Sequence, residues 1–123
     1  MAFTASIGES SVKAASGHVI PFSRVITNVG NSYDAITSAF TAPYDGQYMI
    51  FVSVDTSSDY KRLAITNNGH SIIPGHNDGP DHHIYAGGVL SLLKGDEVTV
   101  SHGPEVVGVV DGGPEAIFSG FKI

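Results

Sequence analysis

The chain of 123 residues contains no cysteine, no long apolar run and few basic residues. Without cysteine there are no disulfides. Their absence does not decide between an oxidising and a reducing compartment, because an oxidising environment permits disulfides without requiring them. No stretch of about 18 apolar residues is present, so no membrane-spanning helix is predicted. Six basic residues against twelve acidic ones give a net charge of −6. That balance argues against binding to the phosphate backbone of nucleic acids.

Targeting and stalk segments are missing from the sequence as well. The first residues lack the charged start and apolar core of a signal peptide. The sequence opens with Met1-Ala2-Phe3-Thr4-Ala5. No collagen-like Gly-x-y run and no coiled-coil heptad precede it. We therefore expect a single domain over residues 1–123, long enough to bury roughly two thirds of its unfolded surface.

The motifs of common enzyme classes are also absent. There is no Gly-x-Ser-x-Gly, no His-Glu-x-x-His, no phosphate-binding glycine loop before a helix and no cysteine nucleophile. His18, Ser53 and Asp34 supply the residue types of a catalytic triad, but nothing in the sequence brings them together. We predict that the protein is not an enzyme.

What the chain does contain is a β-strand pattern. Glycine and proline, 15 and 6 residues, punctuate short runs of Val, Ile, Phe, Tyr and Thr, and no long window carries a helical apolar stripe. Residues with access to positive φ predict turns. These turns are Asp45-Gly46, Asn67-Asn68-Gly69, Lys94-Gly95-Asp96 and Asp111-Gly112-Gly113-Pro114. The pattern predicts an all-β jelly-roll sandwich of about ten strands, without helices.

The segment that follows Gly46 predicts a strand with two different faces. Tyr48, Ile50, Val52 and Val54 share one face and are predicted to line the core. Phe51 lies on the opposite face, where a solvent-facing strand does not favour an aromatic. Two explanations are open: a neighbouring subunit covers Phe51, or Phe51 fills a local groove under a loop of its own subunit.

Three groups of residues occur in the order of a known family. They are Phe22, Asn28, Tyr33, Phe40 and Gly46-Gln47-Tyr48; the block Ile84 to Asp96 with Gly87-Gly88; and the ending Phe118-Ser119-Gly120-Phe121. In this register the chain resembles the globular heads of the complement component 1q family, the trimeric relatives of tumour necrosis factor. The family signature usually has aromatics at the positions of Ile50 and Val52. Both residues here are apolar and lie on the same predicted core face, so the core pattern is kept.

The resemblance implies a tumour necrosis factor-like trimer. Phe51, Tyr85 and Phe118 match the aromatic positions that meet around the threefold axis in the family, and they are the predicted trimer interface. The resemblance also implies a secreted, extracellular protein. Because no collagen stalk precedes the domain, recruitment of complement proteases is not expected.

The segment from His76 to His83 carries metal-ligating residue types. Its candidate ligands are Asp78, Asp81, His82 and His83. In many family members the matching loop binds calcium near the threefold axis, but His83 stands where those members often have Asp. Oxygen ligands favour calcium, whereas imidazole suits zinc or copper. Three alternatives are open: calcium through Asp78 and Asp81, a transition-metal site, or a solvated loop.

Two further polar segments are less specific. The connection from His102 to Glu115 has a valine-rich centre. In the family this connection often contributes to ligand contacts; here it could equally be an added strand edge or a packed loop. Residues 63–121 hold seven acidic residues and one base, Lys94, which predicts a negative surface region. Asp59, Lys61, Arg62 and His70 surround a predicted hairpin and are interpreted as a solvated face.

Two functional classes follow from the resemblance. The first is a secreted homotrimeric recognition module, lectin-like and of the innate immune type. It would bind glycans or microbial surface ligands through outer loops whose residues the sequence does not identify. The second is a divalent-metal-binding extracellular or matrix protein that uses the His and Asp loop. A hormone-like receptor ligand is a third option. No cofactor is certain; calcium is the first candidate, then zinc or copper.

Overall fold

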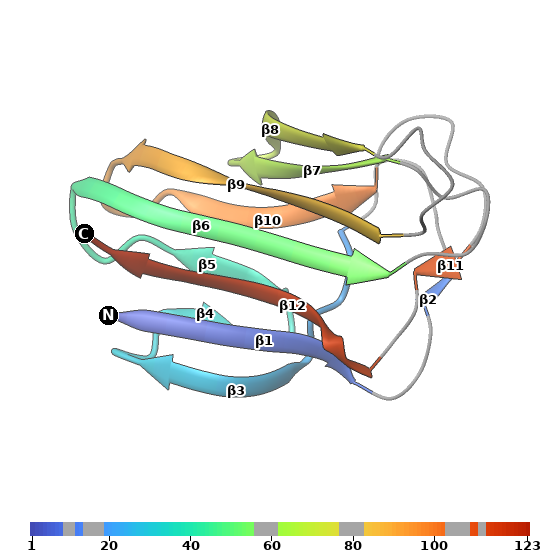
Figure 1. Ribbon diagram of the computed structural model, residues 1–123. Coiled ribbons are helices and arrows are strands. Elements are labelled where there is room, and N and C mark those ends of the chain that lie inside the picture. Colours follow the sequence, from blue (N-terminus) through green and yellow to red (C-terminus); the bar gives the residue numbers. More distant parts are fainter. Residues whose placement is uncertain (9–11, 14–18, 56–61, 77–82, 103–108, 111–112) are drawn as a thin grey trace.

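The computed structural model describes residues 1–8, 12–13, 19–55, 62–76, 83–102, 109–110 and 113–123. They form two antiparallel five-stranded sheets that pack face to face, with a two-stranded pair beside them (Figure 1). The predicted all-β sandwich of about ten strands is confirmed, since ten strands make up the two main sheets. Within these described ranges there is no helix, and hence none long and apolar enough to cross a membrane.

The first layer, which we call the front sheet, contains the longest strands. In order across the sheet these are β3 (Arg24–Val29), β1 (Ala2–Gly8), β12 (Gly113–Lys122), β6 (Gly46–Asp55) and β9 (His83–Leu92). Because β1 pairs with β12, the two ends of the chain lie at the same end of the sandwich (Figure 1).

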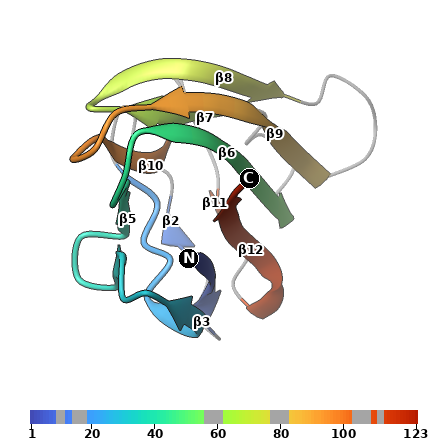
Figure 2. The ribbon, with the colours of Figure 1, turned by 90° about the vertical axis from the view of Figure 1, so that its left-hand side faces the viewer.

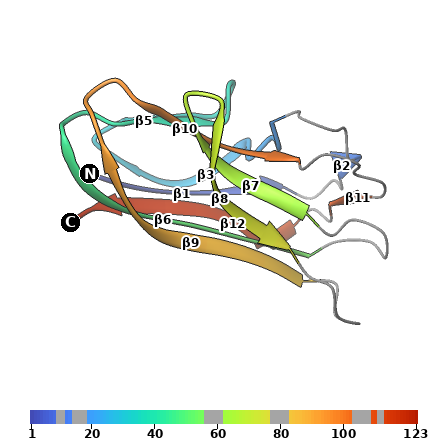
Figure 3. The same cartoon turned by 90° about the horizontal axis from the view of Figure 1, so that it is seen from above.

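The second layer, the back sheet, is built from shorter strands. In order these are β4 (Tyr33–Asp34), β5 (Ala39–Thr41), β10 (Glu97–His102), β7 (Arg62–Asn67) and β8 (His70–His76). Seen end-on, β12 of the front sheet and β5 of the back sheet lie on opposite sides of the molecule (Figure 2). The view from above shows β5 and β10 of the back sheet on one side and β6 and β12 of the front sheet on the other (Figure 3).

The structure bears on two of the sequence interpretations: it confirms the predicted hairpin and, among the alternatives for the valine-rich connection, it shows an added strand over the residues that it describes. The predicted hairpin joins β7 to β8, with positive φ at Asn68 (52°) and Gly69 (83°), the backbone that a tight two-residue hairpin turn requires. The valine-rich connection contains an added strand, β11 (Val109–Val110), which pairs with β2 (Val12–Lys13).

The core lies between the sheets and is rich in aromatic rings. The four inward residues of β6 predicted from alternation, Tyr48, Ile50, Val52 and Val54, are all fully buried. Phe3 is central: its ring stacks on Tyr33 at 5.0 Å and on Phe40 at 4.9 Å, and it meets Phe118 edge-on at 4.9 Å. Burying one such side chain stabilises the fold by about 1.5–3 kcal/mol.

Gly120 shows why the last strand needs a glycine among its aromatics. A Cβ at this position would lie 2.7 Å from Ile50 Cδ1 and 2.8 Å from Phe3 Cε1, both in the core. Real Cβ contacts do not come this close, so even alanine would force the two core side chains apart. The Phe118-Ser119-Gly120-Phe121 ending therefore reflects close packing of β12 on the core.

Asn28 explains a second part of the sequence signature. Its side-chain amide donates to the Tyr33 carbonyl at 2.9 Å and accepts from the Tyr33 backbone N–H at 3.1 Å. This pair of hydrogen bonds closes the turn between β3 and β4. The spacing of Asn28 and Tyr33 is thus set by the reach of one amide across the turn.

Asp96 organises the turn between β9 and β10. Its carboxylate accepts from the Leu93 backbone N–H at 3.0 Å and from the side-chain amides of Asn68 and Asn67 at 3.1 and 3.3 Å. These hydrogen bonds, the Leu93 bond foremost, lower the pKa of Asp96. Gly95 has a φ of 93°, the left-handed backbone that glycine favours, so Lys94-Gly95-Asp96 forms the predicted turn.

Candidate functional site

The outward side of β12, β6 and β9 carries exposed apolar side chains, which we call the outer face. In register across the three strands, its rows are Ile117–Ser53–Tyr85, Ser119–Phe51–Gly87 and Phe121–Met49–Val89. Four large apolar side chains remain exposed there. Their exposed fractions are 37% for Phe51, 49% for Phe121, 56% for Val89 and 70% for Tyr85. A contiguous apolar face of this kind marks an interaction surface.

Phe51 stands at the centre of the outer face. Its two neighbours in the row, Ser119 and Gly87, have small side chains. A shallow hollow of about 160 Å³ lies beside it, lined by Met49, Phe51, Ser119, Gly120 and Phe121. Since more than a third of Phe51 stays exposed, its own subunit does not enclose it, which disfavours the local-groove alternative.

The placement of Phe118 corrects the sequence prediction for the interface. Its side chain is fully buried in the core, against Phe3 and Phe22, and its strand partner Val52 is equally buried. A side chain enclosed by its own subunit is not available to a neighbour. Of the three predicted interface aromatics, Phe51 and Tyr85 therefore lie on the outer face and Phe118 does not.

Two outer-face residues were missed by the sequence analysis. Phe121 and Val89 flank Met49 and are both about half exposed. The sequence analysis placed Phe118 at the interface, so alternation along the strand gave no signal for Phe121; once pairing turns Phe118 inward, the same alternation places residue 121 on the outer face. For Val89 the same alternation runs from Tyr85 through Gly87.

The outer face ends in polar pairs at both ends of the strands. At one end Ser91 donates to the Gln47 side chain at 2.9 Å. At the other end β9 begins with His83, whose Nδ1 lies 2.7 Å from Asp55 Oδ1 and whose Nε2 lies 2.8 Å from Ser53 Oγ. The imidazole also contacts the Tyr85 ring, with a centroid distance of 6.2 Å. These contacts fix the position of the His83 ring next to Tyr85 at this end of the outer face.

Ser53, His83 and Asp55 have the order of groups that activates a nucleophile. A carboxylate only accepts hydrogen bonds, so His83 donates from Nδ1 to Asp55, and in the neutral imidazole Nε2 is then the acceptor for the Ser53 hydroxyl. The sequence analysis had considered Ser53 with other partners and missed this set, which arises from pairing of residues 28 and 30 positions apart. His83 and Asp55 are 43% and 40% exposed, and water competes for their hydrogen bonds on this open sheet surface.

Most of the predicted metal loop lies outside the described residues. This applies to Asp78, Asp81 and His82, whereas His83 is described at the start of β9. Among the residues that the structure describes, no three His, Asp or Glu side chains gather closely enough to hold a metal ion. The metal prediction therefore stays a prediction, with Asp55 now placed beside His83.

Comparison with known proteins gives consistent relatives. The sequence matches the family described as the C1q domain over residues 2–123. It is 33% identical over 112 residues to complement C1q tumor necrosis factor-related protein 3 of Homo sapiens, covering 84% of this chain and 43% of the relative. Complement C1q tumor necrosis factor-related protein 5 of Homo sapiens is 35% identical over 71 residues, covering 58% of this chain and 29% of that protein. The chain thus spans less than half of these relatives.

Solved structures agree on the fold. The globular domain of zebrafish complement 1qA protein superposes with a TM-score of 0.79 and 19% identity, covering 99% of this chain and 96% of that one. Eiger TNF from S. frugiperda superposes with a TM-score of 0.74 and 12% identity, covering 100% and 92%. The family match over nearly the whole sequence and the shared jelly roll lead to one conclusion: the chain belongs to the C1q domain family.

Proposed function

We propose that this chain is an extracellular homotrimeric recognition module that binds glycans or other microbial surface ligands. Domains of the C1q family are typically trimeric recognition modules. The observation that carries the proposal is the outer face, on which Phe51, Tyr85, Val89 and Phe121 are exposed in one subunit. A role in binding, without catalysis, agrees with the C1q and tumour necrosis factor-related proteins that this chain resembles.

The chemistry of the outer face suits contact with further copies of the chain. Its centre is apolar, and its ends are the Gln47–Ser91 and His83–Asp55 pairs. Subunit interfaces commonly combine an apolar, aromatic centre with a polar rim. Association would remove Phe51 and Tyr85 from water, at about 25 cal/mol for each Å² of apolar surface buried.

Glycan binding is the finer part of the proposal and needs its own test. Three weak sites presented on one trimer gain affinity for a repetitive surface through avidity, without any new contact. A glycan and lipopolysaccharide array, probed with the wild-type protein in calcium and in chelator, is expected to show selective binding above a non-specific control. Absence of selective binding in both conditions would contradict the proposal.

Binding of a divalent metal is the second candidate, and one contact favours it. Asp55 Oδ1 lies 2.7 Å from His83 Nδ1, which places a carboxylate beside a candidate imidazole ligand at one end of the outer face. Around a threefold axis, three such pairs would supply three imidazoles and three carboxylates. Metal ligation by His83 would have to replace its contact with Asp55 or Ser53, because each ring nitrogen already faces a partner.

Calorimetric titration with zinc and with calcium separates the alternatives. A His82→Ala/His83→Ala double variant is expected to lose zinc binding, and an Asp78→Ala/Asp81→Ala double variant to lose calcium binding. Metal binding that is unchanged in both variants would place the site elsewhere in the chain. No binding to the wild-type protein would leave the solvated-loop interpretation.

A further inference from the structure

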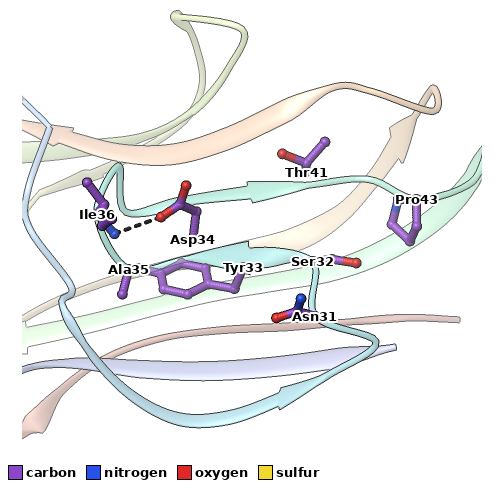
Figure 4. A pocket seen from close by; sticks show the side chains of 8 residues that line it. All are labelled: Asn31, Ser32, Tyr33, Asp34, Ala35, Ile36, Thr41 and Pro43. Carbon is purple, nitrogen blue, oxygen red and sulfur yellow. Dashed lines mark hydrogen bonds between the residues drawn. The ribbon is translucent and has the colours of Figure 1, made fainter.

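An open cavity lies at the β3 and β4 edge of the sandwich. It has a volume of about 670 Å³, within the range of small-ligand sites. Its lining residues are Asn31, Ser32, Tyr33, Asp34, Ala35, Ile36, Thr41 and Pro43. Figure 4 shows Asp34 and Ile36 at one end of the cavity and Asn31, Ser32 and Pro43 at the other. No residue of the outer face is among the lining residues.

Hydrogen bonds to the fixed backbone hold the walls of this cavity in place. Tyr33 donates its hydroxyl to the Phe22 carbonyl at 2.6 Å, and the Asn28 amide fixes its backbone at both N–H and carbonyl. Asp34 is oriented by the Ile36 backbone N–H, which donates to its Oδ1 at 2.8 Å (Figure 4). Sites held this way lose little freedom when a ligand binds.

The backbone of the 31–38 segment is unusual for its residue types. Asn31 and Ser38 have φ values of 54° and 55°, and with Asn68 they are the only described non-glycine residues in this left-handed region. Asn tolerates this conformation, whereas at Ser38 it costs energy that the fold must supply. Within this segment the side chain of Ile36 is almost entirely in solvent, at 95% exposure. An aliphatic side chain presented beside a cavity gives a ligand an apolar surface to cover.

We propose that this cavity binds a neutral saccharide, an inference that rests on the proposed glycan-binding role and names its site. A sugar ring offers hydroxyl donors on its edge and C–H groups on its face. Asp34 Oδ2, which has no hydrogen-bond partner among the described residues, accepts from ring hydroxyls. The Thr41 hydroxyl and the Asn31 amide add polar partners, while Ile36 and Pro43 contact the C–H face.

The charge of the cavity selects against acidic sugars. Asp34 is the only charged residue among the eight that line it, and no Lys or Arg is among them. A carboxylate or phosphate on the ligand would meet Asp34 without a compensating cation. The same hydroxyl geometry on a neutral hexose or N-acetylhexosamine meets no such repulsion. Recognition is therefore directed to neutral glycans and away from sialylated or phosphorylated ones.

The position of the cavity is compatible with assembly through the outer face. The outer face lies on β12, β6 and β9, and β9 forms one edge of the front sheet. The cavity lies at the opposite side, near β3 and β4, which are the other edge strands of the two sheets (Figure 1). Three subunits joined through their outer faces would keep three cavities open for a multivalent surface.

Titration of the isotope-labelled protein followed by NMR tests the site directly. The probes are methyl α-mannopyranoside, N-acetylglucosamine and, as the acidic sugar, N-acetylneuraminic acid. A neutral probe is expected to shift the backbone amides of residues 31–36 and 41, and the acidic probe to leave them unchanged. Shifts confined to other segments, or stronger shifts with the acidic probe, would overturn the inference.

Matched variants measure the contribution of the two polar groups. Asp34→Asn removes the charge and is expected to weaken binding of the neutral probe about tenfold or more, and Thr41→Val about three- to tenfold. Asp45→Asn is the control for the first, because Asp45 also accepts one backbone N–H, from Lys94 at 2.7 Å, outside the cavity. Thr27→Val, on exposed strand β3, is the control for the second.

The outcomes separate this inference from the proposed function. Array binding by the wild-type protein that falls in Asp34→Asn and Thr41→Val but not in the controls supports both. Array binding that survives in both cavity variants overturns the cavity site and leaves the recognition role standing. No wild-type binding on the array and no shift with any probe contradicts both. The dispersed amide spectrum of each variant shows whether it is folded.

Discussion

Tyr33 connects the core, the β3–β4 turn and the cavity at the residue scale. Its ring stacks on Phe3, its hydroxyl donates to the Phe22 carbonyl, and its backbone is held by Asn28. The side chain is 5% exposed, so water does not replace these contacts when one is lost. Removal of a single oxygen atom here should therefore have a measurable effect on stability.

Tyr33→Phe is expected to lower the free energy of unfolding by about 1–3 kcal/mol, because it leaves the buried Phe22 carbonyl without its donor. Tyr44→Phe is the matched control, since Tyr44 is 63% exposed and its hydroxyl makes no hydrogen bond within the described part of the chain. Urea unfolding at equal subunit concentration compares them with wild type. Equal losses in the two variants would contradict the role given to the Tyr33 hydroxyl.

Alkaline pH should destabilise the protein through the same residue. Burial, with a smaller effect from the Asp34 carboxylate, raises the pKa of Tyr33 from 10.0 to about 12. Below pH 10 both states keep the proton and the stabilisation is fully present. Between about pH 10 and 12 the unfolded state binds fewer protons than the folded state, so the free energy of unfolding falls by about 1.4 kcal/mol per pH unit.

The check is urea unfolding of wild type and Tyr33→Phe at about pH 9, 10 and 11. The wild-type free energy of unfolding should fall more steeply with pH than that of the variant. Parallel pH dependences would show that Tyr33 is not the residue whose pKa is raised.

Strand β6 links the core to the outer face at the scale of an element. Each row of the outer face passes through it, and its alternate residues are fully buried. Its neighbour β12 repeats the arrangement, with Phe118 inward and Phe121 outward. The side chains of Phe51 and Phe118, on adjacent strands, therefore point to opposite faces of one sheet.

Truncation of these two phenylalanines should have different consequences. Phe118→Ala removes core packing and is expected to cost the subunit about 3–5 kcal/mol of folding free energy. Phe51→Ala should leave the subunit folded and weaken association by about 2 kcal/mol or more for each copy. Circular dichroism reports the fold, and sedimentation velocity reports the assembly. Unfolding by Phe51→Ala, or normal assembly with this change, would contradict the outer-face account.

Alternation along one strand could be predicted from the sequence, whereas register between strands could not. Tyr48 to Val54 forms a continuous run, so its two faces follow from period-two counting. Around Phe118, glycines and a proline interrupt the apolar pattern. Which face of the sheet its side chain lies on follows from its pairing with Val52 and Ala5. The meeting of His83 with Asp55 and Ser53 and the cavity around Asp34 also depend on contacts between segments, which a single sequence does not contain.

The whole molecule presents two distinct surfaces on one small sandwich. The outer face on β12, β6 and β9 is apolar with polar ends, whereas the cavity near β4 combines polar and apolar side chains with a single negative charge. Assembly through the first surface would multiply the second threefold. The net charge of −6 per chain opposes close approach of copies, so the apolar contact must supply the attraction.

Light scattering coupled to size-exclusion chromatography tests the central claim, assembly as a homotrimer through the outer face, most directly. At micromolar concentration the wild-type protein should elute as one species with three times the chain mass of 12.8 kDa. Phe51→Ala should shift the population toward the single-chain mass at the same concentration. A wild-type protein that elutes at 12.8 kDa would contradict the account.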